Sequence, residues 1–145
     1  MSLKLDLIKK MNIMICDDDP TITAGIKKLN DRVAKDLIIN ISSEITHNAI
    51  DCLYKIFKDY YLGIRYDLLL IDETMPFMNG STLTKILKDI SSLKELNNIT
   101  IYSITGYDDI DILNNIKSFG CDGFIKKPVK YQELKLVFED ILNQD

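Results

Sequence analysis

The chain has 145 residues, 46% of them hydrophobic, and its 18 basic and 22 acidic residues give a net charge of −4. This length and composition are typical of one folded domain with a substantial core, which excludes a mainly disordered chain. Nucleic-acid-binding proteins usually carry a basic face, so the acidic balance predicts no direct nucleic-acid partner.

The three cysteines form no Cys-x-x-Cys pair, so neither a zinc knuckle nor a disulfide framework is predicted. Their odd number favours a reducing compartment. His47 is the only histidine, which excludes a two-histidine metal site. No apolar run approaches the roughly 18–20 residues that cross a bilayer. Lys4 and Asp6 also interrupt the apolar N-terminus, which is therefore a poor signal peptide. We expect a cytoplasmic protein with no membrane contact in this segment.

We interpret residues 1–10 as an N-terminal extension or linker and residues 11–145 as one domain. Short β-branched and aliphatic runs there alternate with longer amphipathic segments. Five such runs predict strands, at Ile13–Cys16, Leu37–Ile41, Leu68–Ile71, Thr100–Ile104 and Gly123–Ile125. The third run reads LLLI without alternation, which is typical of a central strand buried on both faces.

Each run is followed by apolar residues at intervals of three and four, which predict five helices. The stripes are Ile22, Ile26, Leu29 and Val33; Ile50, Leu53, Ile56 and Phe57; Leu83, Ile86, Leu87 and Ile90; Ile110, Leu113 and Ile116; and Leu134, Val137, Phe138 and Ile141. The expected caps are Asp19 or Thr21 for the first helix, Thr46 for the second and Asp108 for the fourth, with Gly120 at the end of the fourth.

Five strand–helix units in succession predict an α/β fold with a parallel, doubly wound sheet covered by helices on both faces. Ligands of such sheets bind outside the carboxyl ends of the strands. The residues that follow the predicted strands are therefore candidates for a site. They are Asp17 and Asp18 after the first strand, Asp72 at the end of the third, Thr105 after the fourth and Lys127 after the fifth.

Asp17, Asp18 and Asp72 resist ionising side by side, because like charges raise each other's pKa. A divalent cation resolves this conflict, and Mg²⁺ prefers a few carboxylate oxygens together with water and phosphate oxygens. With a hydroxyl and a lysine opposite, the set predicts a phosphoryl-transfer site in which an aspartate oxygen attacks phosphorus.

Four segments carry a family resemblance: NIMICDDDP (12–20), YDLLLIDETMPFMNG (66–80), IYSITGY (101–107) and GCDGFIKKP (120–128). In this order and spacing, between about Met11 and Asn143, the chain resembles the CheY-like receiver domains of two-component response regulators and hybrid sensor histidine kinases. The resemblance implies a flavodoxin-like (βα)5 sandwich with strand order 2-1-3-4-5. It also implies a signalling phosphoacceptor that assists only its own phosphoryl transfer and dephosphorylation, not an enzyme.

The resemblance implies a role for each matching residue. Asp72 matches the phosphoacceptor, Asp17 and Asp18 match the acidic pair that holds Mg²⁺ (or Mn²⁺) together with Asp72, and Thr74 matches the residue whose backbone carbonyl binds the metal. Thr105 matches the switch hydroxyl, Lys127 matches the motif lysine, and Phe124 matches the switch aromatic. Pro76 and Gly80 match the residues that shape the loop after the acceptor. Two positions depart from the commonest pattern: Phe124 replaces tyrosine, and Gly106 replaces alanine.

The implied partners are a histidine kinase or histidine phosphotransfer protein as donor, and a downstream effector on the face of the fourth helix, fifth strand and fifth helix. A phosphorylation-dependent dimer is a further expectation. The segment is expected to be either a stand-alone receiver or a receiver excised from a hybrid histidine kinase or a longer response regulator. The connections Lys58–Tyr66 and Ser91–Asn98 exceed a minimal receiver and are interpreted as partner-specific surface.

Other readings of the same residues stay open. Asp17–Asp19 could serve only as helix-capping acids favoured by the helix dipole. Lys126 is interpreted as a solvated charge and His47 as a surface residue. A phosphatase of the haloacid-dehalogenase type also uses a strand-end aspartate, but its second aspartate is replaced by Thr74. A receiver that docks without accepting phosphate is another alternative. A P-loop nucleotidase is excluded because the chain has no G-x-x-x-x-G-K-[ST] motif.

Overall fold

The structure is a computed structural model that describes residues 8–91 and 99–144. In this part of the chain, five strands alternate with five helices, whose labels begin at α2. They are β1 (Lys10–Cys16), α2 (Pro20–Leu37), β2 (Asn40–Thr46), α3 (Ala49–Tyr61), β3 (Leu68–Asp72), α4 (Gly80–Ser91), β4 (Thr100–Thr105), α5 (Ile110–Ser118), β5 (Gly123–Lys126) and α6 (Tyr131–Leu142).

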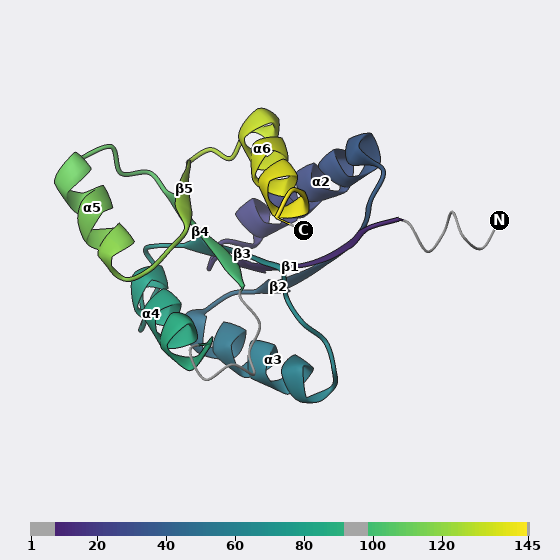
Figure 1. Ribbon diagram of the computed structural model, residues 1–145. Coiled ribbons are helices and arrows are strands. Elements are labelled where there is room, and N and C mark those ends of the chain that lie inside the picture. The colour runs from purple at the N-terminus through teal and green to yellow at the C-terminus, as the bar shows by residue number, and fades with distance from the viewer. Residues whose placement is uncertain (1–7, 92–98, 145) are drawn as a thin grey trace.

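All strand pairs are parallel and the sheet order is β2-β1-β3-β4-β5. Helices α2 and α6 cover one face of the sheet, and α3, α4 and α5 cover the other (Figure 1). Two buried apolar clusters fill the two sides, one including Ile26 and Phe138, the other Cys52 and Leu83. The predicted α/β fold and strand order are confirmed.

The central strand β3 is buried along its whole length, as its unbroken apolar sequence predicts. The second predicted strand is present, but its bounds are wrong, because Leu37 ends α2 and β2 starts only at Asn40. Between them Ile38 turns the chain in a left-handed conformation, with φ of 56°. β2 lies at the edge of the sheet and reads NISSEIT, so a search for apolar runs misses its polar half.

The helix caps follow the predictions in part. Asp19 caps α2 by accepting a hydrogen bond from the Thr21 amide at 2.9 Å. Asn48, not Thr46, caps α3, and Asp109, not Asp108, caps α5. In both cases the predicted residue lies too early, because Thr46 is still part of β2 and Asp108 pairs with Lys126. Gly120 follows the end of α5 with φ of 111°.

Two residues of the predicted core stripes face solvent instead. Ile50 is 58% exposed and Ile110 is 65% exposed, so both stripes begin later than predicted. The predicted connection Lys58–Tyr66 is helical as far as Tyr61. Most of the predicted connection Ser91–Asn98 lies outside the described residues. No helix within residues 8–91 and 99–144 combines the length and the apolar character required to cross a membrane.

Candidate functional site

A cavity of about 490 Å³ lies at the carboxyl edge of the sheet, where the strand ends bring distant residues together. Its lining contains every residue predicted for the metal and the transferred group, namely Asp17, Asp18, Asp72, Thr74, Thr105 and Lys127, together with Asp19, Ile22, Gly106 and Tyr107. β1, β3, β4 and β5 are neighbours through parallel pairing, so their last residues meet at this edge.

Three carboxylates converge in this cavity. Asp17, Asp18 and Asp72 each offer an oxygen, and these oxygens lie within 4.8 Å of one another. Asp17 is 1% exposed and Asp72 is 4% exposed, whereas Asp18 is open to solvent. This is the convergence that the sequence predicts, with two buried acids and one at the mouth.

Asp17 is held by the backbone around it. Its amide donates to the Thr46 carbonyl at 3.2 Å, and its Oδ1 accepts from the Asp19 amide at 2.9 Å. The second oxygen, Oδ2, is buried and makes no hydrogen bond to the described residues. Burial raises the pKa of Asp17; the hydrogen bond from the Asp19 amide lowers it, and the charge of Asp72 adds a smaller rise, so that the pKa is raised overall.

Lys127 provides the positive charge opposite the acids. Its Nζ lies 2.8 Å from Asp72 Oδ1 and 3.7 Å from Asp17 Oδ2. Its amide donates to the Thr105 carbonyl at 2.9 Å, which fixes the lysine at the end of β5. Burial lowers the pKa of Lys127, but the hydrogen bond with Asp72 and the surrounding carboxylates outweigh this effect and raise it overall.

The acidic cluster is suited to a hard divalent cation. One lysine faces two buried carboxylates and a third at the mouth, and the unsatisfied Oδ2 of Asp17 is an oxygen that a cation would bind. Buried polar atoms in proteins usually have a partner, so this oxygen is compatible with a role as a cation ligand. The exposed Thr74 lines the same cavity.

Thr105 and Phe124, the two predicted switch residues, lie on neighbouring strands. Thr105 is 3% exposed, and its Oγ1 accepts a hydrogen bond from the Tyr107 amide at 3.1 Å. Phe124 is partly buried against the core on the α3–α4 side and pairs in register with Ser103. Thr105 lines the cavity and Phe124 does not, and the movement of both residues stays a prediction.

The loop after Asp72 depends on two residues. A Cβ on Gly80 would lie 2.4 Å from the Asp72 carbonyl oxygen, so a side chain there displaces the backbone of the acceptor. Glu73 is buried and accepts hydrogen bonds from the Ser81 hydroxyl at 2.7 Å and the Ser81 amide at 3.0 Å. Sequence reasoning missed this capping role, because an acid eight residues before its partner matches no local capping pattern.

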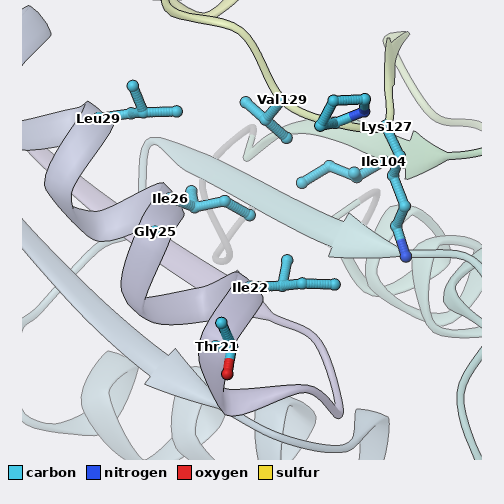
Figure 2. A pocket seen from close by; sticks show the side chains of 9 residues that line it. Thr21, Ile22, Gly25, Ile26, Leu29, Ile104, Lys127 and Val129 are labelled. Atoms are coloured by element: carbon cyan, nitrogen blue, oxygen red, sulfur yellow. The ribbon is translucent and has the colours of Figure 1, made fainter.

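An apolar groove of about 400 Å³ adjoins the acidic cavity and was not predicted from the sequence. Figure 2 shows Ile22, Ile26 and Leu29 along α2 facing Ile104 and Val129 across it. Lys127 lines both hollows. The groove is visible only after folding, because α2 and residues 127–129 are far apart in the sequence.

The remaining candidates take the simpler roles. Lys126 points away from the site and pairs with Asp108 at 2.6 Å, with both side chains exposed. His47 is exposed, with Nδ1 3.1 Å from the Asp17 carbonyl oxygen. Cys16, Cys52 and Cys121 are buried and free.

With this geometry established, comparison with known proteins defines the class. The family model described as the response regulator receiver domain matches residues 13–139, and the chain belongs to this family. Polar-differentiation response regulator DivK from Brucella anthropi is 29% identical over 120 residues, which are 81% of this chain and 85% of DivK.

A second relative is much longer than the match. The cyclic di-GMP phosphodiesterase of Thermotoga maritima is 32% identical over 80 residues, which are 54% of this chain but only 20% of that protein. Among solved structures, a putative response regulator from Chloroflexus aurantiacus matches with a TM-score of 0.76 and 23% identity, covering 94% of this chain and 100% of the other. At this identity the structural match supports the fold alone.

Proposed function

We propose that this receiver domain is a phosphoacceptor that takes a phosphoryl group onto Asp72 from a phosphohistidine on a partner protein. The observation that carries the proposal is the contact of Lys127 Nζ with Asp72 Oδ1 at 2.8 Å inside a cluster of three carboxylates. A turn residue or a helix cap has no need for a lysine partner at its buried carboxylate, whereas an acceptor of a charged group does.

In the transfer step, an oxygen of Asp72 attacks phosphorus. The new P–O bond forms as the P–N bond to the donor imidazole breaks, and the imidazole nitrogen keeps the electron pair and takes a proton from solvent. Mg²⁺ (or Mn²⁺), held by Asp17, Asp18, Asp72 and the carbonyl of Thr74, supplies positive charge to the phosphoryl oxygens. Lys127 then pairs with a phosphoryl oxygen instead of the free carboxylate.

Two further residues respond to the new group. Thr105 is buried beside Asp72, and its hydroxyl donates to a phosphoryl oxygen after transfer. Phe124 then occupies the space that Thr105 leaves. This biases a two-state surface formed by α5, β5 and α6 that a downstream effector reads. Ile110 and Leu136, 65% and 62% exposed on α5 and α6, supply apolar contacts for it. A phosphorylation-dependent dimer is a second use of the same surface.

The donor is a histidine kinase or a histidine phosphotransfer protein, and we propose that it contacts the apolar groove beside Lys127. The groove adjoins the cavity directly, so a helix seated there carries its phosphohistidine to Asp72. The longer relative from Thermotoga maritima supports the proposal that such receivers also occur as parts of longer proteins. A cytoplasmic location goes with these partners, and the protein's role is signalling rather than catalysis of substrate turnover.

Phosphorylation by acetyl phosphate tests this function without a partner. We expect intact-mass spectrometry to detect one added phosphoryl group on the wild type with Mg²⁺, and none on Asp72→Asn or after chelation by EDTA. Asp31→Asn, an exposed acid on α2, is the matched control and is expected to label normally. Equal labelling of wild type and Asp72→Asn contradicts the proposal, and so does continuous release of phosphate from phosphate esters, which favours a phosphatase.

A further inference from the structure

The outer face of α3 carries an apolar stripe that the site does not use. Ile50, Tyr54, Phe57 and Tyr61 recur at intervals of four, three and four, which places them along one side of the helix. Ile50 is 58% exposed, Tyr54 67% and Tyr61 83%, whereas Phe57 between them is half-buried. The opposite side of α3 is already occupied, because Ala49, Cys52 and Ile56 are buried against the sheet.

The apolar surface continues beyond the end of the helix. Leu62 is 67% exposed and Ile64 is 42% exposed, so α3 and the turn after it hold five of the eleven large hydrophobic side chains that are exposed in the described part of the chain. We call Ile50, Tyr54, Phe57, Tyr61, Leu62 and Ile64 the α3 patch. Tyr61 is supported from the side by an edge-on contact with Tyr60, with 5.7 Å between ring centroids. Arg65 stacks on Tyr60 in turn, 4.0 Å from its centroid.

The size of the patch distinguishes it from ordinary surface. An aromatic side chain carries roughly 150–250 Å² and an Ile or Leu side chain somewhat less, so the five exposed fractions correspond to on the order of 600 Å² of surface. Scattered single hydrophobic residues are normal on a monomer, but a contiguous patch of this size marks an interaction site. Two such patches facing each other bury about 1,200 Å², the lower limit of a specific interface.

The charges beside the stripe indicate what covers it. Asp51 and Lys58 are both exposed and lie seven residues apart on the same flank of the stripe. When two helices pack antiparallel, the same flank of each helix faces the other, so Asp51 of one copy lies beside Lys58 of the second, twice. In a parallel pair this flank would face Leu53 and Tyr60, which carry no charge. The pattern is therefore complementary to itself in the antiparallel arrangement.

We propose that two copies of this chain associate through antiparallel α3 helices, with Tyr54 of each copy packed against Phe57 of the other. The contact is a two-fold, isologous interface. α3 packs on β1, β2 and α4, and it lies apart from α5, β5 and α6 (Figure 1). This dimer therefore leaves the proposed effector surface open and is distinct from a phosphorylation-dependent dimer on that surface.

Sedimentation equilibrium of the full chain, from about 5 µM to 1 mM, tests the proposal, because an interface of this size predicts a weak dimer. We expect a dimer for the unphosphorylated wild type and a monomer for Tyr54→Glu. Leu136→Glu, which replaces a similarly exposed residue on α6, is the matched control and is expected to keep the dimer. Urea unfolding of each variant separates loss of association from loss of folding.

Charge reversal tests the orientation. Asp51→Lys and Lys58→Asp each turn two attractive pairs into repulsive ones, so we expect each to raise the dimer Kd about tenfold. The double variant restores opposite charges in the antiparallel pair and is expected to return the Kd to near its original value. A wild-type monomer at 1 mM, a dimer that survives Tyr54→Glu but not Leu136→Glu, or a double variant weaker than either single one overturns the proposal.

Discussion

The buried carboxylate of Asp17 makes a sharp prediction about metal binding and stability. We expect Asp17→Asn to be more stable than the wild type in EDTA by about 1–2 kcal/mol, and to gain nothing from Mg²⁺. The wild type is expected to gain about 2.7 kcal/mol when Mg²⁺ is at a hundred times its Kd. The order of stability of the two proteins therefore reverses as Mg²⁺ is added.

The magnitude in EDTA follows from the contacts of Asp17. At an effective dielectric constant of about 20, unit charges 4 Å apart interact by about 4 kcal/mol. Repulsion from Asp72, with oxygens within 4.8 Å, therefore nearly cancels attraction to Lys127 at 3.7 Å. What remains is desolvation of a side chain that is 1% exposed, which costs several kcal/mol. The hydrogen bond from the Asp19 amide offsets about 1.5–3 kcal/mol of this cost in the wild type, whereas asparagine keeps only a neutral bond of about 0.5–1.5 kcal/mol, so a net gain of about 1–2 kcal/mol remains for the variant.

Urea unfolding at pH 7, followed by circular dichroism in EDTA and in increasing Mg²⁺, measures both effects. Asp19→Asn is the matched control: it removes one charge next to the site and keeps a residue that caps α2. We expect this variant to respond to Mg²⁺ as the wild type does. Our reasoning is refuted if Asp17→Asn is less stable than the wild type in EDTA, or if Mg²⁺ stabilises both proteins equally.

Three further predictions concern stability. Ile38 has a left-handed backbone that strains its β-branched side chain, and this side chain is 77% exposed. We therefore expect Ile38→Gly to raise the free energy of unfolding by about 1 kcal/mol, measured by urea unfolding. A lower free energy of unfolding in this variant would show that the backbone at Ile38 is not strained. Gly80→Ala is expected to lower the free energy of unfolding by about 2–3 kcal/mol and to slow labelling by acetyl phosphate, because the new Cβ collides with the Asp72 carbonyl. Unchanged stability and labelling would show that the loop accommodates the Cβ. Burial raises the pKa of Glu73 and Asp17, so their contribution to the free energy of unfolding is complete below about pH 4 and is lost as the pH rises through the folded pKa values. In EDTA, we expect the free energy of unfolding to fall less between pH 4 and pH 8 for Glu73→Gln than for the wild type. Equal falls for the two proteins would exclude Glu73 as a source of this pH dependence.

Much of the site was predictable because parallel strands deliver their last residues to one edge. Asp17, Asp72 and Lys127 lie at the ends of apolar runs in the sequence, and the sheet order then brings Lys127 Nζ to 2.8 Å from Asp72 and 3.7 Å from Asp17. The edge strand β2 was misplaced, because half of its residues are polar and its apolar run overlaps the end of α2.

Features formed by packing between distant segments were beyond local patterns. The groove between α2 and Val129 joins residues about a hundred positions apart, and no periodicity encodes it. Ile50 fits the core stripe of α3 by spacing alone, yet it faces solvent. Periodicity tells which residues share a side of a helix, but the neighbouring elements decide which side is covered.

Lys126 and Lys127 are consecutive in the chain, but their ammonium groups lie in different surroundings. Lys126 holds Asp108 in the open, whereas Lys127 holds Asp72 in a recess. Dissolved salt screens the first pair strongly and the second weakly. Ionic strength is therefore a means of loosening the segment between β4 and α5 while the acceptor and its counter-charge stay together.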